Sequence, residues 1–188
     1  MAVAIVDDTH RWTREEYERK AEEGFFSPDA RVELIEGIVY DMAPQNSFHC
    51  AGIGALKKAL RAAFPEEEHE FRVQMPIALG DDSEPEPDLA VVPGSFVDYV
   101  YAHPTTALLI CEVADSSLLH DRRRKIPLYA RFEIPEVWLH NLKNRTLEVY
   151  RNPVDGQYTS KTVLRKGETI SPLVRPDVLI AIADLFPW

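Results

Sequence analysis

The chain has 188 residues, a length that suits a single domain. It is 45% hydrophobic and 28% charged, which is ordinary for a globular protein with a real core. Its 21 basic and 31 acidic side chains give a formal net charge of −10. This charge excludes a uniformly basic nucleic-acid coat, so any contact with DNA or RNA must come from a local basic patch.

Cysteine and hydropathy patterns favour a cytoplasmic location. Cys50 and Cys111 lie in apolar-rich segments and are expected to be small buried side chains, not a disulfide framework or a zinc site. No apolar run approaches the roughly 18 residues that a membrane span needs. Ala2–Val6 precedes two aspartates without a basic leader, which predicts no signal peptide.

The N-terminal half predicts two helices and a hairpin. Thr13-Arg14-Glu15-Glu16 matches a capping box, and Gly24 is a stop signal, so a helix is expected over 13–23. Strand-like segments at 31–35 and 38–42 flank a turn and predict a hairpin. A second helix is expected to begin with Ser47 as its cap and to end near Phe64, before a proline.

The rest of the chain alternates strands with one helix. The strands are predicted over 70–79, 89–92, 107–113, 137–140, 146–150 and 157–164, and the helix over 118–132. No repeat or low-complexity linker divides the chain. We therefore expect one α/β or α+β domain over 1–188, in which residues 1–30 form an N-terminal helical extension.

Glu112 is the most informative residue of the sequence. It lies near the C-terminal end of the apolar run Ala107–Val113, which is typical of a central strand buried on both faces. An unpartnered polar group there costs about 2–7 kcal/mol. Glu112 therefore belongs to a buried salt bridge, to a strand end that has reached solvent, or to a functional site.

Asp88 directly precedes the apolar strand at 89–92. Glu84 and Glu86 lie on the same face of the extended segment before it, and for them a solvated acidic loop is the simpler interpretation. Asp88 differs because it abuts an apolar strand. It is the second candidate carboxylate.

Lys125 completes the set. Arg122, Lys125 and Tyr129 share one face of the predicted helix, although a basic run such as 121–125 can also be an ordinary solvated face. Two carboxylates suit Mg²⁺ or Mn²⁺. Such a metal lowers the pKa of a bound water, which a lysine can orient or deprotonate. Spacing alone does not show that these groups converge.

Several segments resemble the Uma2 family (DUF820), restriction-endonuclease-like proteins of the PD-(D/E)XK nuclease superfamily. The resemblance runs from about residue 12 to the Ala-Asp-Leu-Phe near the end of the chain. It is carried by the order and spacing of six pieces: Val32-Glu33-Leu34-Ile35-Glu36-Gly37, His49 at a helix start, Pro85-Glu86-Pro87-Asp88-Leu89-Ala90-Val91-Val92, Leu109-Ile110-Cys111-Glu112-Val113, Asp121-Arg122-Arg123-Arg124-Lys125 and Ile134-Pro135-Glu136-Val137-Trp138.

The resemblance implies a restriction-endonuclease-like core, a mixed β-sheet flanked by helices, with catalytic residues on one edge. Asp88 and Glu112 would bind the metal, and Lys125 would be the catalytic lysine. The superfamily's usual lysine position, two residues after Glu112, is occupied by Ala114. Glu33 resembles the additional acidic residue of the site, and Glu36 is an alternative for that role.

Further residues are assigned through the same resemblance or through their position. Gln74, His49 and Tyr129 are expected to support the catalytic groups, although His49 could equally cap or pack its helix. Arg122, Arg123 and Arg124 are expected to contact DNA phosphates.

Two positions depart from the family pattern. Pro127 stands where the family usually continues a helix, so it can kink the helix and shift Lys125. Asn141 stands where relatives often have aspartate, and we expect that position to be structural.

The sequence thus predicts a Mg²⁺- or Mn²⁺-dependent endonuclease that cleaves DNA and forms a homodimer. Asp88→Asn or Lys125→Ala should abolish cleavage and leave the fold intact. One alternative is a catalytically inactive interaction module that has kept the nuclease fold. Another is a phosphodiesterase that acts on RNA or on a small nucleotide.

Overall fold

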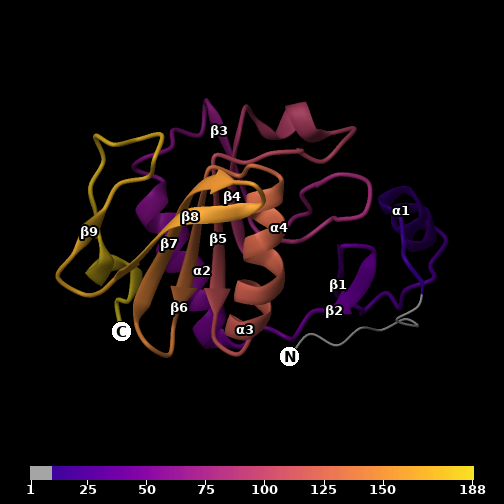
Figure 1. The fold of residues 1–188 in the computed structure, drawn as a ribbon, viewed down its shortest axis with the longest axis horizontal. Helices are drawn as coiled ribbons and strands as arrows, with labels where there is room; N and C mark the ends of the chain where they lie inside the picture. The colour runs from indigo at the N-terminus through magenta and orange to yellow at the C-terminus, as the bar shows by residue number, and fades with distance from the viewer. Residues whose placement is uncertain (1–9) are drawn as a thin grey trace.

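A six-stranded mixed sheet forms the centre of the structure, a computed structural model that describes residues 10–188 (Figure 1). β5 and β6 run parallel, whereas the other neighbouring strands run antiparallel. The two parallel strands therefore end at the same edge of the sheet. In sheet order the strands are β3 (His69–Arg72), β4 (Leu89–Pro93), β5 (Leu109–Ala114), β6 (Glu136–Asn141), β7 (Thr146–Val154) and β8 (Gln157–Leu164).

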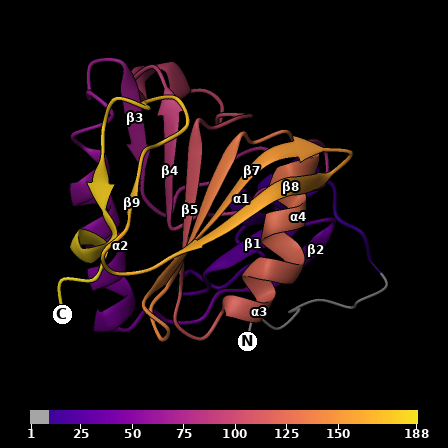
Figure 2. The same cartoon turned by 60° about the vertical axis from the view of Figure 1, so that its left-hand side comes forward.

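Helices cover both faces of this sheet (Figure 2). α2 (Ser47–Leu60) packs on one face in an apolar cluster that includes Leu109 and Val113. α4 (Ile126–Arg131) belongs to the cluster on the other face, which includes Ile110. β5 is buried along its whole length, as its apolar run predicts. The expected architecture, a mixed sheet flanked by helices, is confirmed.

Two predicted boundaries differ from the structure. The cap of α2 is Asn46, not Ser47, because the Asn46 side chain accepts the backbone N–H of His49. This helix ends at Leu60, four residues earlier than expected. The strand expected over 70–79 ends at Arg72, since Gln74 adopts a left-handed backbone conformation with φ of 51°.

The helix expected over 118–132 is interrupted by a π-helical turn. α3 (Leu118–His120) leads into the π turn Asp121–Lys125, which leads into α4. The N–H of Ile126 donates to the carbonyl of Asp121, five residues back. Pro127 has no N–H to donate, so the regular ladder is already incomplete beside this turn. The expected irregularity is therefore a π turn that ends at Lys125.

The N-terminal part of the described chain lies beside the sheet (Figure 1). Its elements are α1 (Arg14–Glu22), capped by the Thr13 side chain as predicted, and the hairpin β1 (Val32–Ile35) and β2 (Ile38–Asp41). Trp12 and buried residues of these elements form an apolar cluster of their own. Ala2–Val6, on which the leader prediction rests, lies outside the described residues.

Short elements complete the structure. β9 (Thr169–Ile170) pairs with β10 (Ile180–Ala181), and 3-10 turns span Phe96–Tyr99 and Ile182–Leu185. Cys111 is buried as expected, whereas Cys50 is exposed, because it faces away from the core at the start of α2. In the part of the chain that the structure describes, no helix has the length and apolarity to cross a membrane.

Candidate active site

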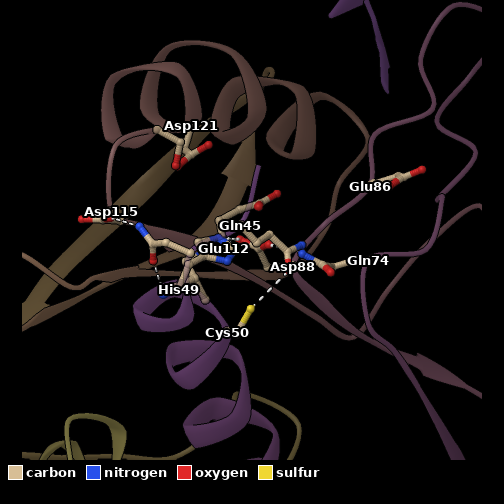
Figure 3. Close-up of polar contacts among 12 residues, drawn as sticks. Gln45, His49, Cys50, Gln74, Glu86, Asp88, Glu112, Asp115 and Asp121 are labelled. Atoms are coloured by element: carbon tan, nitrogen blue, oxygen red, sulfur yellow. Dashed lines mark hydrogen bonds and ion pairs between the residues drawn. The ribbon is translucent and has the colours of Figure 1, made fainter. Parts of the chain in front are cut away.

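Asp88 and Glu112 meet because of the pairing between β4 and β5. Leu89 lies opposite Cys111 in this antiparallel pair, and extending the register by one residue places Asp88 opposite Glu112. The side chains are buried, with exposed fractions of 8% and 2% for the two residues. Both line one pocket, and Figure 3 shows them close together at its centre.

Glu112 projects from β5 toward the helical segment on its face of the sheet. The hydroxyl of Tyr129 donates to its Oε1 at 2.5 Å. The Nζ of Lys125 lies 3.3 Å from Oε1 and 3.4 Å from Oε2. These partners offset much of the cost of burying the carboxylate. Tyr129 thus supports Glu112 from α4.

Lys125 connects β5 with the N-terminal hairpin. Its Nζ lies 3.1 Å from Oε2 of Glu33, a buried residue of β1, and 3.5 Å from the carbonyl of Glu86. Glu33 also accepts the backbone N–H of Glu86 and lies 3.7 Å from Nε2 of His120. Glu33, Lys125 and Glu112 therefore form a continuous buried ion cluster.

Asp88 has a different set of partners. Its Oδ2 accepts the backbone N–H of Val113 at 2.8 Å and lies 3.2 Å from Nε2 of His49. Its Oδ1 accepts the Gln74 side-chain amide at 3.1 Å. The left-handed conformation that ends β3 thus occurs at a residue that supports Asp88. His49 and Gln74 both line the pocket beside it (Figure 3).

The site concentrates negative charge around one lysine. Burial raises the pKa of Glu112 to about 8, and the neighbouring Asp88 and Asp121 add to this rise against the opposing effect of Lys125. Burial opposes charge on Lys125, but Glu112 and Glu33 raise the pKa of its ammonium well above the ordinary value. The lysine is therefore held as a cation.

The two remaining groups shift in the directions that their partners dictate. Burial alone would raise the pKa of Glu33, but Lys125 and His120 hold it below the ordinary value. Burial likewise opposes charge on His49, yet its hydrogen bond to Asp88 raises the pKa of the imidazole. Both ion pairs thus favour the charged forms of their members.

Asp121 is a pocket residue that the sequence reasoning missed. It lies in the π turn, is 3% exposed and accepts the Ser117 hydroxyl at 2.7 Å. Burial raises its pKa to about 6. Its sequence signal was its place four residues before Lys125, where helical spacing puts both on one face. That signal was hidden because Asp121 opens a basic run.

The three arginines expected to bind DNA lie in different surroundings. Arg122 is bound to the buried Glu148 of β7 through two guanidinium nitrogens. Arg124 lies 3.8 Å from Glu36, and Arg123 is exposed. None of the three lines the pocket that holds Asp88 and Glu112.

The acidic candidates outside the ion cluster also separate. Glu36 forms surface ion pairs with Arg131 and Arg124, whereas Glu33 lines the pocket. The prediction that Glu84 and Glu86 are solvated was wrong. Glu84 is 5% exposed and Glu86 is half-buried, since the strand-like segment that carries them packs against β1.

The donor chemistry of the pocket fits a hard divalent cation. Asp88, Glu112 and Asp121 all contribute carboxylates to its lining, and their repulsion raises the pKa of Glu112. Within residues 10–188, no three acidic, histidine or cysteine side chains are close enough to form a complete metal-binding group. One or two carboxylates are sufficient where water and substrate phosphate supply the other ligands of Mg²⁺.

The fold and this buried ion cluster define a restriction-endonuclease-like protein. A solved structure described as "a putative nuclease belonging to DUF820 from Anabaena variabilis ATCC 29413" matches 94% of this chain and 98% of its own, with a TM-score of 0.74 and 16% sequence identity. The Uma2 family model, described as "Putative restriction endonuclease", matches residues 14–183. The chain belongs to the Uma2 family, which confirms the resemblance. No curated protein matches the chain.

Proposed function

We propose that this protein is a Mg²⁺- or Mn²⁺-dependent endonuclease that hydrolyses phosphodiester bonds in DNA. In this reaction the oxygen of a water molecule bonds to phosphorus, a phosphorus–oxygen bond to the sugar breaks, and the leaving oxygen takes up a proton. The family description supports this class of activity. The restriction to DNA and the dependence on a metal are our inference from the site.

The observation that carries the proposal is the meeting of Asp88, Glu112 and Lys125 in one open pocket. Each of these residues is less than a tenth exposed, and all three line the pocket. Burying charged groups costs several kcal/mol per ion, and replacing such a cluster with apolar residues is often neutral or stabilising. Fold stability alone therefore gives little reason for placing these charges beside a pocket.

The roles follow from the contacts of each side chain. Asp88 and Glu112 would hold the cation, which would polarise the phosphodiester and lower the pKa of the attacking water. Lys125 would donate to the phosphate oxygens, where negative charge increases during the reaction. Tyr129 orients Glu112, while His49 and Gln74 orient Asp88. Glu33 holds Lys125 from the opposite side.

An assay of plasmid cleavage with Mg²⁺ or Mn²⁺ tests this proposal. The wild-type protein is expected to cut DNA, and Asp88→Asn should lose at least a hundredfold of the rate. This substitution keeps the size of the side chain and an oxygen acceptor for the Val113 N–H. Arg123→Ala is the control, because its exposed side chain lies outside the pocket. Equal cleavage by wild type and Asp88→Asn would contradict the assignment.

The saturated ion cluster favours one alternative. Lys125 already has two carboxylate partners, which is also the arrangement of a structural salt bridge in a catalytically inactive interaction module. A folded wild-type protein that cleaves neither DNA nor RNA with either metal would support that alternative. Cleavage of RNA or a small nucleotide, but not of DNA, would change only the substrate class.

A further inference from the structure

A second pocket lies on the same face of the sheet as the candidate active site. It is lined by residues of β7, β8 and the turn between β6 and β7, together with Arg122 from the π turn. Its charged lining residues are four cations and one anion: Arg122, Lys143, Lys161, Arg165 and Glu148. We call it the basic pocket. Four cations on one small surface are unusual in a chain with a net charge of −10.

Strand register places this pocket in line with the candidate active site. Glu112 on β5 pairs with Leu139 on β6, which pairs with Glu148 on β7, which in turn pairs with Val163 on β8. Directly opposite residues share a face of the sheet. One cross-strand row therefore runs from Glu112 into the basic pocket. Two strand spacings, roughly 10 Å, separate Glu112 from Glu148.

The π turn also links the two sites. Arg122 and Lys125 lie three residues apart in this turn. Lys125 contacts Glu112, whereas Arg122 contacts Glu148. The same helical segment therefore contributes a cation to each site. The carboxylate of Glu148 is matched by Arg122 and by Lys161, whose Nζ lies 2.9 Å away.

The other two cations of the basic pocket have no acidic partner. Lys143 and Arg165 are exposed, and within residues 10–188 neither side chain forms an ion pair. Extending the pairing of Leu147 with Leu164 by one residue places Arg165 opposite Thr146, beside the β6–β7 turn that carries Lys143. Asn141 also lines the pocket. It is 2% exposed, and its Nδ2 donor has no partner among the described residues.

We infer that the basic pocket binds backbone phosphates of a polynucleotide strand whose scissile bond lies at Asp88 and Glu112. This inference rests on the proposed function and specifies its substrate as a chain that extends from β5 toward β8. At about 3.4 Å of helix rise per nucleotide, roughly 10 Å corresponds to about three nucleotides. A mononucleotide would occupy only the first pocket. Clustered cations with side-chain amide and hydroxyl donors are the usual partners of a phosphate backbone.

The test measures binding of a fluorescein-labelled 20-nucleotide DNA strand by anisotropy over a series of salt concentrations. All variants carry Asp88→Asn, so that the DNA stays uncut. Lys143→Gln with Arg165→Gln removes the two unpaired cations of the pocket. Lys57→Gln with Lys58→Gln on α2 makes the same change in net charge outside both pockets.

The pocket variant is expected to bind at least tenfold more weakly at moderate salt. The slope of log affinity against log salt should fall in magnitude by about 2, close to one for each lost phosphate contact. The α2 variant should keep the slope of its parent. Equal effects of the two pairs, or an unchanged slope in the pocket variant, would overturn the inference.

Failure of this inference is distinguishable from failure of the proposed function. If wild type cleaves DNA but the pocket variant binds with its parent's salt slope, the active-site assignment stands and the basic pocket does not bind the substrate. If wild type cleaves no nucleic acid, the proposed function fails, and a reduced salt slope would then identify the basic pocket as a nucleic-acid-binding site alone.

Discussion

At the scale of single residues, the site depends on one buried lysine. Lys125 is 4% exposed and lies between two carboxylates that are 3% and 2% exposed. Removing one member of such a cluster leaves uncompensated buried charge, which costs about 3–5 kcal/mol. The structure therefore changes one expectation from the sequence. Lys125→Ala should weaken the fold as well as abolish cleavage.

Chemical denaturation tests this point directly. Lys125→Ala is expected to lower the free energy of unfolding by about 3–5 kcal/mol. The triple variant Lys125→Ala, Glu112→Gln, Glu33→Gln should recover part of this loss, because no buried charge is left unpaired. Arg123→Ala, an exposed control, should stay within about 0.5 kcal/mol of wild type. A Lys125→Ala protein as stable as wild type would contradict a buried ion cluster.

Tyr129 offers a milder test of the same cluster. Tyr129→Phe removes the hydroxyl that donates to Glu112 and retains the packing of the ring. A buried hydrogen bond to a charged group contributes about 1.5–3 kcal/mol. We expect a loss of that order in thermal or chemical unfolding, together with slower cleavage. Unfolding and cleavage that both match wild type would show that the hydroxyl does not support Glu112.

Glu148 gives a pH-dependent prediction outside the candidate active site. Burial opposes its charge, but Arg122, Tyr150 and Lys161 lower the pKa of its carboxyl to about 2. Because the folded pKa lies below the ordinary value of 4.5, its stabilisation is fully present above pH 4.5 and is lost as the pH falls toward 2. Unfolding of Glu148→Gln should depend less on pH between 5 and 2 than that of wild type. Identical pH profiles would rule out this role.

At the scale of elements, the close approach of α2 to β5 supports the site. A Cβ added at Gly52 would lie 2.8 Å from Cγ1 of Val113 and 3.0 Å from Cδ2 of Leu142. The same Val113 donates its backbone N–H to Asp88. The glycine therefore permits a helix–sheet distance on which the position of Asp88 depends.

Alanine substitutions in α2 test this dependence. Gly52→Ala should destabilise the fold by about 1–3 kcal/mol through overpacking and should slow cleavage. Gly54→Ala is the matched control in the same helix, since nothing lies within 4 Å of its added Cβ. It should gain up to about 1 kcal/mol from helix propensity. Similar denaturation midpoints for the two variants would contradict close packing at Gly52.

Local patterns predicted the elements better than their ends. The apolar run that contains Glu112 predicted β5, and Thr13 predicted the start of α1. Asn46 and Ser47 are both good caps, so their order along the chain could not decide between them. The end of β3 at Arg72 depends on the left-handed Gln74, and the hydrophobic pattern does not specify that conformation.

The candidate site was predictable in residue type but not in arrangement. The position of Asp88 before an apolar strand marked it, and so did that of Glu112 within one. Their approach requires the β4–β5 register, which is set by tertiary packing. Asp121 was missed because its role appears only when the π turn brings it into the pocket.

At the scale of the whole molecule, charge is distributed unevenly. The chain carries a net charge of −10, yet the basic pocket gathers four cations on the face of the sheet that carries Glu112. Such a distribution suits a protein that meets a polyanion on one face only. The approach of DNA would then be restricted to one orientation.

Cleavage of both strands of a duplex favours two copies of this site. We therefore predict a homodimer, since symmetric pairing is the commonest way to supply two equivalent sites. Sedimentation velocity at micromolar protein concentration should give a mass near twice that of the 21.4 kDa chain. A single monomeric species over that concentration range would contradict this prediction.

The central claim is that Asp88 and Glu112 share one metal ion. Calorimetric titration of Mn²⁺ into wild type and into the double variant Asp88→Asn, Glu112→Gln tests this claim most directly. We predict saturable binding to the wild type and no such binding to the variant, with both proteins folded by circular dichroism. Binding of equal strength in the two proteins, or no binding to the wild type, would contradict a shared metal site.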